Sequence, residues 1–517
     1  MKLNIKHIGW YALAAVLGGV QALGFAPQPL GVVQIGSLAG MLLLLTYVAR
    51  PARVAFVFGL AWFCAGLYWL HFSMHGVGGL PTWMSALAII ALSSYLAMYY
   101  MLAFGVWRRF FAQLRVSSYL VAFPALWLVA ELARGYVFGG FPWLASGYAH
   151  IDNPLLKGWF AIFGVYGVGF AAAMCAGALA FVGRCAIERR REVKGLALTA
   201  ASMAVWAVVG LIVQGLNWGE KSGAPISVNV VQPNVAQTNK FDEQVMLSNT
   251  LSFIKQATQS PAQLTVFPET ALPYPWTQVP IEPLEALHTR LNGRAVLMGG
   301  VGIDEAKHEF YNSAMWLSEE DDLLDPPRYD KIHLLPFGEM IPWGFQWFVD
   351  AMKIPLGGYG YGQSQKPFEL NVAGQITRIG VNICYENEFG EELIKAWGNG
   401  DATAPNVWVN MSNLGWFGAV NQSTAQEQHL HMSRARALEM ARPVVVATNT
   451  GLSAYIDASG VVVQQLRPDA TVSATVQVQG MQGLTPYIGW GNSPMLGLAS
   501  LLFGLSVFLR HRVMELD

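Results

Sequence analysis

A single cysteine in the middle of this chain stands where a catalytic nucleophile could act. Cys384 lies in the run Gly-Val-Asn-Ile-Cys-Tyr-Glu over residues 380–386, and the sequence has no other cysteine between residues 217 and 485. Upstream, Glu269 and Lys331 also follow segments that we expect to be strands. A thiol, a carboxylate and an amine that meet in one pocket can transfer an acyl group through a thioester.

Each of these groups has a task in such a reaction. Cys384 must be a thiolate when it attacks, Lys331 can stabilise the thiolate and the oxyanion, and Glu269 can accept the thiol proton. The backbone N–H of Tyr385 is a second oxyanion donor if Cys384 lies on a tight strand-to-helix turn. Taken singly, the three side chains also fit a buried inert thiol, a turn or cap residue and a surface lysine. Their shared position at strand ends favours the functional interpretation.

These residues must be positioned in a chain that is largely apolar. Of its 517 residues, 53% are hydrophobic and 13% are charged, which indicates a membrane protein. The formal net charge of -1 gives no indication of a nucleic-acid partner. We expect about eight membrane spans, near residues 8–25, 30–48, 54–71, 83–106, 118–138, 159–183, 195–217 and 494–510.

Basic residues alternate between the loops and predict an orientation. Lys and Arg gather before the first span, after the second, fourth and sixth spans, and after the last span, and these loops belong in the cytoplasm. The loops at 25–31 and 71–82 contain neither Lys nor Arg. An odd number of crossings then places the soluble block on the outer face and both termini inside. In that oxidising compartment an unpaired Cys384 is either buried and inert or retained for its reactivity.

The soluble block alternates strands and helices, which predicts an α/β domain. An excess of strands near its end suggests two stacked sheets with outer helices. We expect a membrane domain over 1–217, an outer domain over 218–485, and a last span with a short tail over 486–517. The expected strands are 226–231, 264–267, 295–298, 378–383, 407–410, 444–447, 461–466 and 472–478, and the expected helices are 242–259, 282–291, 391–397 and 425–441.

The runs around the three reactive residues resemble a known family. Glu269 after Phe-Pro, then Lys331, then Cys384 before Tyr-Glu, resemble the nitrilase superfamily of carbon–nitrogen hydrolases, whose triad is Glu, Lys and Cys. Longer runs are similar to those of apolipoprotein N-acyltransferases: YDKIHLLPFGE at 329–339, NMSNLGWFG at 410–418, RARALE at 434–439, and GFPWL at 140–144 in the membrane part.

The resemblance implies an αββα nitrilase-like sandwich carried on the periplasmic side of the inner membrane by eight helices. It implies a monomer that needs no cofactor or metal. Cys384 would take an acyl chain from a phospholipid, usually phosphatidylethanolamine, and pass it to the α-amine of the diacylglyceryl cysteine of an apolipoprotein. By the same resemblance Glu339 and Glu386 are supporting carboxylates, and Glu339 positions Lys331 or the base.

Aromatic residues and glycines suggest where lipid is contacted. Trp343 and Trp347, followed by a glycine-rich run that includes Gly358, suit a mobile lid that dips into lipid, although an ordinary packed loop has the same composition. Trp416 and Phe417 follow a strand end and fit either acyl-chain contact or core packing. The family that this chain resembles would lead us to expect tryptophan at position 241, where this chain has Phe241, so the resemblance implies no role for an indole there.

Two other functions fit parts of this pattern. A membrane-tethered amidase would use the same three residues with water as the acceptor, but the apolar spans favour a lipid substrate. A transporter or receptor would need more charges inside the spans, where Glu131 and Arg134 are the main ones. His429 and His431 do not share a helix face, so they imply no metal site.

Overall fold

The computed structural model describes residues 5–25, 27, 29–112, 116–240, 242–347, 358–398 and 400–514. Two compact units make up the chain. The first comprises residues 1–71, 81–216 and 489–517, and the second comprises residues 72–80 and 217–488. The short segment 72–80 therefore groups with the second unit although it lies between two helices of the first.

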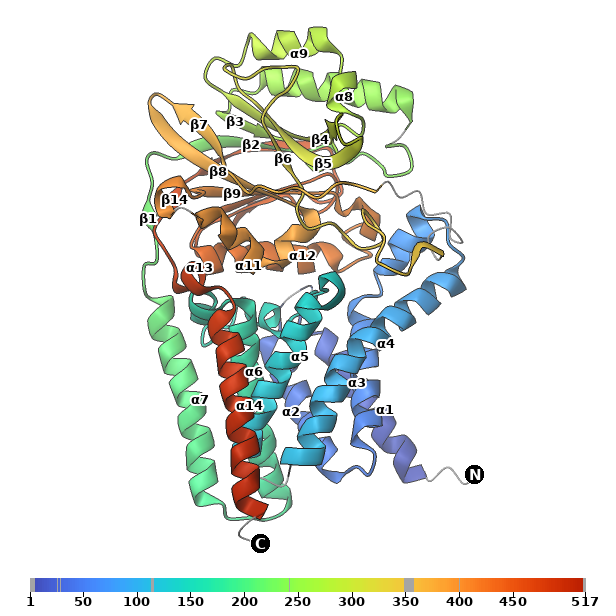
Figure 1. Ribbon diagram of the computed structural model, residues 1–517, viewed down its shortest axis with the longest axis vertical. Coiled ribbons are helices and arrows are strands. Elements are labelled where there is room, and N and C mark those ends of the chain that lie inside the picture. The colour runs from blue at the N-terminus through green and yellow to red at the C-terminus, as the bar shows by residue number, and fades with distance from the viewer. Residues whose placement is uncertain are drawn as a thin grey trace. The chain divides into compact units, whose positions relative to one another are not determined.

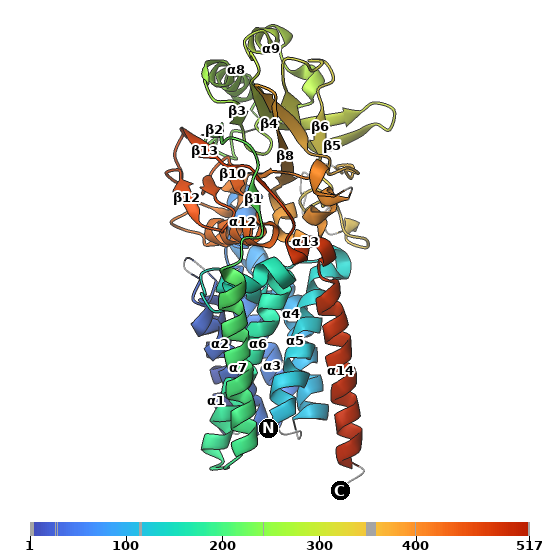
Figure 2. The ribbon, with the colours of Figure 1, turned by 90° about the vertical axis from the view of Figure 1, so that its left-hand side faces the viewer.

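The first unit is built from apolar helices. They are α1 (Ile5–Ala22), α2 (Gly31–Tyr47), α3 (Pro51–Gly66), α4 (Thr82–Val106), α5 (Phe123–Tyr136), α6 (Phe160–Ile187), α7 (Val193–Gln214) and α14 (Ser493–Met514). These helices run alongside one another, and α1 begins at the end of the bundle where α14 ends (Figures 1 and 2). Apolar side chains on α7, such as Val205 and Ile212, are more than half exposed, as expected of a surface that faces lipid.

Each of the eight expected spans overlaps one of these helices. Within the described residues, four helical segments are long and apolar enough to cross a membrane: 82–111, 118–139, 157–187 and 193–214. The other four apolar segments are shorter, at 8–22, 31–47, 51–66 and 493–505. The helical unit therefore contains several apolar helices whose length and composition suit a membrane, and the number of eight spans stays a prediction.

The second unit contains two six-stranded sheets. The first has the order β13-β2-β3-β4-β5-β6, with β13 (Val472–Val478), β2 (Ile226–Gln232), β3 (Leu264–Val266), β4 (Ala295–Asp304), β5 (Glu309–Leu317) and β6 (Arg328–Asp330). The second has the order β12-β11-β10-β9-β8-β7, with β12 (Val462–Gln465), β11 (Ala454–Ile456), β10 (Val444–Thr448), β9 (Val407–Ser412), β8 (Gln375–Ile383) and β7 (Phe368–Val372). A separate short pair joins β1 (Glu220–Lys221) to β14 (Met481–Gln482).

Helices cover the outer face of each sheet. Figure 1 shows α8 (Glu243–Gln259) and α9 (Ile281–His288) on one side, and α11 (Gly390–Leu393) and α12 (Ala425–Met440) on the other, with α13 (Pro486–Trp490) near the end of the unit. The Asp242 side chain caps α8 by accepting hydrogen bonds from the backbone N–H groups of Gln244 and Val245. The expected helix–sheet–sheet–helix layering is thus present.

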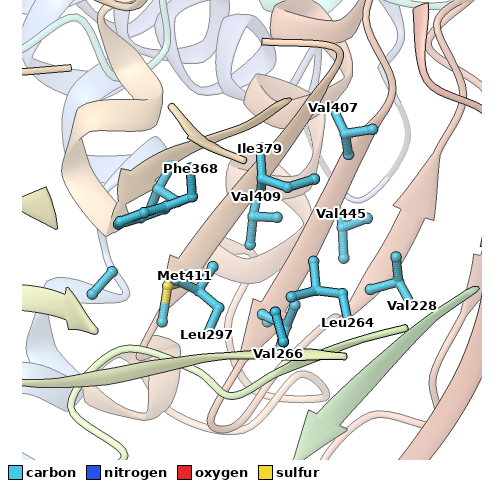
Figure 3. Close-up of a cluster of buried hydrophobic side chains, with 14 of the residues drawn as sticks. Val228, Leu264, Val266, Leu297, Phe368, Ile379, Val407, Val409, Met411 and Val445 are labelled. Carbon is cyan, nitrogen blue, oxygen red and sulfur yellow. The ribbon is translucent and has the colours of Figure 1, made fainter. Parts of the chain in front are cut away.

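Aliphatic side chains from both sheets interlock between them (Figure 3). Val228, Leu264, Val266 and Leu297 come from the first sheet, and Ile379, Val407, Val409, Met411 and Val445 come from the second. Each of these side chains is almost fully buried, and burial of one such side chain is worth about 1.5–3 kcal/mol. This core fixes the strands firmly, so residues at the strand ends are held in defined places.

All eight expected strands and three of the four expected helices of this unit are confirmed. The expected helix over 391–397 is instead the short α11 followed by a 3-10 helix over Ile394–Trp397. Four of the strands that sequence patterns missed are β5, β6, β7 and β11. Polar residues interrupt β5, whose backbone pairs antiparallel with β4 along its whole length. Parallel pairing joins β2, β3 and β4 in one sheet and β8, β9 and β10 in the other. In α/β proteins, ligands gather at the carboxyl ends of parallel strands.

Candidate active site

Glu269 lies just beyond the carboxyl end of β3. The backbone N–H of Phe267 still donates to Leu297, and Pro268, which has no N–H, then ends the ladder. The Glu269 side chain is 8% exposed. Its Oε1 accepts a hydrogen bond from Asn312 Nδ2 at 2.8 Å and its Oε2 accepts one from the backbone N–H of Asn413 at 2.9 Å. Both carboxylate oxygens are therefore fixed by donors from other strands.

Lys331 follows β6 and is the centre of a buried ion cluster. Its side chain is 1% exposed, with Nζ 2.7 Å from Glu339 Oε2 and 3.7 Å from Glu269 Oε1. Burial by itself lowers the pKa of this ammonium, but the charges of Glu339, Glu269 and the neighbouring Cys384 outweigh it, and the net pKa is raised. Lys331 is therefore a permanent positive charge at the pH values of a cell.

Cys384 lies on a sharp turn between β8 and a short 3-10 helix over Cys384–Glu388. Its φ angle of 52° is in the left-handed region, which costs a residue with a Cβ about 1–2 kcal/mol. Such strain persists only where surrounding contacts hold the backbone. As a whole residue Cys384 is half-buried, and its side chain packs against the core between the two sheets.

Glu386 supplies the contacts that hold this turn. Its Oε2 accepts a hydrogen bond from the backbone N–H of Ile383 at 2.7 Å. Its Oε1 accepts one from the N–H of Ile332 at 2.7 Å and one from the N–H of His333 at 3.1 Å. The Tyr329 hydroxyl donates to the same carboxylate, which is 2% exposed. Glu386 therefore ties the cysteine turn to the segment that carries Lys331.

The thiol of Cys384 is protonated at rest. Burial raises its pKa well above the ordinary value, and the negative charge of Glu269 raises it further. Lys331 and a hydrogen bond from the backbone N–H of Asn413 act in the opposite direction without reversing the shift. A neutral thiol needs a base at the moment of attack, and Glu269 is the carboxylate that shares the Asn413 N–H with it.

The structure thus brings together Glu269, Lys331, Glu339, Cys384 and Glu386, which sequence patterns had singled out. Tyr385 is adjacent, but its side chain is buried and packs against the rings of His333 and Phe389, with centroid distances of 5.5 and 5.2 Å. Only its backbone N–H is left as a candidate for contact with a substrate.

The expected lipid-contacting aromatics are exposed. Trp343 is 99% exposed, Trp347 67% and Trp416 36%. Gly358 is exposed and Phe417 is half-buried. Trp416 and Phe417 lie on a short 3-10 helix directly after Asn413, so they are next to the site in sequence. Residues 348–357 of the expected lid and Phe241 lie outside the described residues.

Sequence reasoning missed three contributors to this site. Asn312 donates to both Glu269 and Glu339, and it lies on β5, which polar residues conceal in the sequence. Asn413 lies directly after β9, and its backbone N–H donates to Glu269. Lys240 is 5% exposed, and its Nζ lies 3.5 Å from the backbone carbonyl oxygen of Glu269. Burial lowers the pKa of Lys240 to about 8, and Glu269 partly opposes that shift.

The two halves of the chain match two family models. Residues 227–485 match the carbon–nitrogen hydrolase family, and residues 17–178 match the apolipoprotein N-acyltransferase N-terminal domain. The second unit therefore has the nitrilase-like fold of the carbon–nitrogen hydrolases. A carbon–nitrogen hydrolase superfamily protein from Xanthomonas campestris is a similar solved structure, with 15% identity, a TM-score of 0.37, and coverage of 54% of this chain and 97% of that one.

Full-length relatives narrow the assignment. An apolipoprotein N-acyltransferase from Ralstonia nicotianae is 41% identical over 509 residues, which cover 97% of this chain and 93% of the relative. One from Bordetella bronchiseptica is 36% identical over 530 residues, which cover 95% of each chain. The chain belongs to the apolipoprotein N-acyltransferase family. It is an acyltransferase of the nitrilase superfamily in lipoprotein maturation.

Proposed function

We propose that this protein transfers an acyl chain from a phospholipid to the N-terminal amine of the diacylglyceryl cysteine of apolipoproteins, through a thioester on Cys384. One observation carries the proposal. A buried ammonium, Lys331, contacts the carboxylates of Glu339 and Glu269 and is close enough to Cys384 to stabilise its thiolate when the proton leaves. That arrangement can make, stabilise and resolve an acyl-thioester.

In the first step Glu269 accepts the proton of the Cys384 thiol as the sulfur attacks the ester carbonyl carbon of the phospholipid. The carbonyl oxygen of the ester becomes an oxyanion, which the Lys331 ammonium and the backbone N–H of Tyr385 stabilise. The carbon–oxygen bond to the glycerol then breaks, and the departing oxygen takes the proton from Glu269. The products are the thioester and a lysophospholipid.

In the second step the α-amine of the acceptor attacks the thioester carbonyl. Glu269 accepts a proton from the nitrogen, and Lys331 again stabilises the oxyanion. The carbon–sulfur bond breaks, and the Cys384 thiolate regains a proton from Glu269. The acyl chain is now an amide on the lipoprotein. Both substrates use the same cysteine in turn, which makes the mechanism ping-pong.

We further propose that the protein is a monomer of the inner membrane with eight spans, with its catalytic domain over 218–485 in the periplasm. The flanking parts, 1–217 and 486–517, would then place both termini in the cytoplasm. The alternation of basic loops supports this orientation, as does the position of the α1 start and the α14 end at one end of the helical unit. Phosphatidylethanolamine is the proposed donor.

The decisive experiment weighs the intact purified protein after incubation with phosphatidylethanolamine vesicles alone. We expect the protein to gain the mass of one acyl chain, removable by hydroxylamine. Cys384→Ala should gain none, whereas alanine at Cys64, Cys175 or Cys185 should leave the gain unchanged. An adduct that persists in Cys384→Ala, or that the wild-type protein never forms, would overturn the proposed donor and mechanism.

The proposed periplasmic orientation of the catalytic domain is tested in a separate experiment. Lys307 has a side chain that is 55% exposed, so cysteine at this position can be labelled from solution. We expect a membrane-impermeant maleimide to label Lys307→Cys in intact spheroplasts as fully as in lysed ones. Labelling that requires lysis would place the catalytic domain in the cytoplasm.

A further inference from the structure

A buried amide on β5 links both carboxylates of the candidate site. Asn312 is 6% exposed. Its Nδ2 donates to Glu269 Oε1 at 2.8 Å and to Glu339 Oε1 at 2.6 Å. Its backbone carbonyl oxygen accepts a hydrogen bond from the N–H of Lys331 at 2.9 Å. One residue thus contacts three of the charged residues of the site.

The orientation of this amide follows from its partners. Carboxylates only accept hydrogen bonds, so the NH₂ side of Asn312 must face Glu269 and Glu339. Within the described part of the chain, the Oδ1 atom is buried without a hydrogen-bond partner. The fold thus leaves the acceptor oxygen of this amide unsatisfied while both donor hydrogens bond to carboxylates. The position of Asn312 is therefore explained by what its NH₂ group donates to.

Two carboxylates that share one ammonium have a specific difficulty. Like charges at short range raise the pKa of one partner, and the pair then holds a proton between them. A proton held on Glu269 would prevent it from accepting the proton of Cys384. Lys331 supplies positive charge, and the Asn312 amide adds a neutral donor to each carboxylate without adding a group that titrates.

We propose that Asn312 is a positioning residue that keeps Glu269 and Glu339 ionised together, so that Glu269 is free to accept the proton of Cys384. This inference rests on the proposed function only in giving Glu269 the task of base. Without the amide, each carboxylate loses a hydrogen-bond donor that favours its charged form, and activation of the thiol moves to higher pH.

Within the described residues, Lys331, Lys240, Cys384 and Tyr359 interact electrostatically with one or both carboxylates. Glu386 and His429 contact the backbone of the turn that carries Cys384, and Glu386 also interacts with Lys331. Burial raises the pKa of Tyr359, and the pKa values of Lys331 and Cys384 are raised as well. Lys240, with a pKa of about 8, is charged throughout the acid range.

His429, whose pKa burial lowers to about 4, and Glu386, whose pKa burial raises, contribute to the profile below pH 7 in wild type and in the variants alike. The difference between wild type and the Asn312 variants therefore reports Glu269 and Glu339, the carboxylates that Asn312 contacts.

The test measures the rate of Cys384 alkylation by iodoacetamide against pH, in the full-length protein without lipid. Variants Asn312→Asp and Asn312→Ser are compared with wild type. The acid limb is the part of this profile in which the alkylation rate falls as the pH is lowered. We expect the midpoint pH of the acid limb to rise by one unit or more in Asn312→Ser. The move should be larger in Asn312→Asp, because a third carboxyl group joins the cluster. At pH 6 this amounts to a rate loss of tenfold or more.

Asn406 provides a matched control. It is also a buried asparagine, 5% exposed, whose side chain contacts Ser222, Met481 and Arg378 at the opposite end of β9. Asn406→Ser should lower thermal stability without moving the acid limb. Because Asn312→Asp preserves the shape of the side chain, it decides the question if Asn312→Ser does not fold. An unchanged acid limb in folded Asn312→Asp overturns the inference.

The same samples separate this inference from the proposed function. If the acid limb moves but the wild-type protein forms no acyl adduct with phospholipid, the role of Asn312 stands and the proposed donor fails. If wild type forms the adduct and the limb of the Asn312 variants does not move, only the role of Asn312 fails.

Discussion

Both units of this protein contain a buried ion cluster, one around Lys331 and one around Arg134, and these two clusters are built differently. In the α/β unit, Lys331 is 2.7 Å from Glu339 and 3.7 Å from Glu269. In the helical unit, the closest approach between Arg134 and Glu131 is 4.0 Å. The first cluster is held mainly by its own charges, whereas the second is held mainly by neutral groups around it.

The Arg134 cluster fixes a loop. The guanidinium donates to the backbone carbonyl oxygens of Phe141 and Trp143 at 2.6 Å each, and to the Tyr100 hydroxyl at 3.1 Å. Glu131 accepts hydrogen bonds from the backbone N–H and the hydroxyl of Ser146 at 2.8 Å each. A guanidinium that donates to main-chain oxygens holds their positions and does not exchange protons.

The comparison shows that buried charge does not by itself mark a reactive site. Arg134 and Lys331 are equally buried, at 1% exposure each. Lys331 interacts with Cys384, a nucleophile on a strained turn, whereas Arg134 donates to two main-chain carbonyl oxygens and a tyrosine hydroxyl. The two clusters differ in the groups that lie next to the positive charge. Substitutions at Lys331 should therefore lower activity, and substitutions at Arg134 should lower stability.

The largest effect should follow Lys331→Met. The variant removes the ammonium that stabilises the oxyanion and leaves two carboxylates without their counter-ion, so we expect the rate of acyl-adduct formation to fall by about 10³-fold or more. Single-turnover intact-mass measurements with phosphatidylethanolamine check this. Lys395→Met, at an exposed position of the same unit, should keep the wild-type rate. A rate loss under tenfold would contradict the role of Lys331.

Arg134→Met should act on stability instead. Removing one partner of a buried ion pair costs about 3–5 kcal/mol, and here the hydrogen bonds to the loop are lost as well. We expect the midpoint of thermal inactivation in detergent to fall, while the acyl-adduct rate per folded molecule stays within about twofold. A large loss of the acyl-adduct rate at unchanged stability would show that Arg134, like Lys331, acts on the reaction and not on stability.

Glu386→Gln should give an intermediate result. An amide NH₂ at this position would face backbone N–H groups that now donate to a carboxylate, so the turn that carries Cys384 would relax. We expect the adduct rate to fall by about 10–100-fold, with a loss of stability of about 1–3 kcal/mol. Comparing the rate at saturating phospholipid with the apparent KM separates a misplaced thiol from weaker lipid binding.

The smallest effect concerns His429, a buried group that contacts the turn. Its Nε2 lies 3.4 Å from the backbone carbonyl oxygen of Cys384, and burial lowers its pKa from 6.5 to about 4. The unfolded chain binds a proton in this window and the folded chain does not, so stability falls as the pH drops from 6.5 toward 4. The full loss is about 3 kcal/mol.

Unfolding midpoints measured between pH 7 and pH 4 check this expectation, with His429→Gln as the variant that lacks the titration. A pH slope that is the same in wild type and variant would mean that other groups cause it. The variant should also keep most of its adduct rate at pH 7, because His429 has no task in the proposed chemistry.

The sequence predicted much of the site because chemistry-bearing residues follow strand ends. Glu269 follows β3, and Lys331 and Cys384 follow β6 and β8. Short β-branched runs reveal such strands locally. Sequence patterns did not predict the role of Asn312 because they did not predict β5. That strand mixes polar and apolar residues on both faces and is recognisable only through its pairing with β4. Its two hydrogen bonds reach residues 43 and 27 positions away, which no local pattern encodes.

The sequence by itself determined the apolar blocks, the alternation of basic loops, the order of strands and helices in the soluble block, and the types of the reactive residues. These properties depend on neighbours within a few residues. Tertiary structure alone decided that Glu339 is the closer partner of Lys331, that Cys384 adopts a positive φ angle, and that Asn312 joins two carboxylates. Each of these depends on packing between distant segments, where two sheets and their shared core bring strand ends within hydrogen-bonding distance.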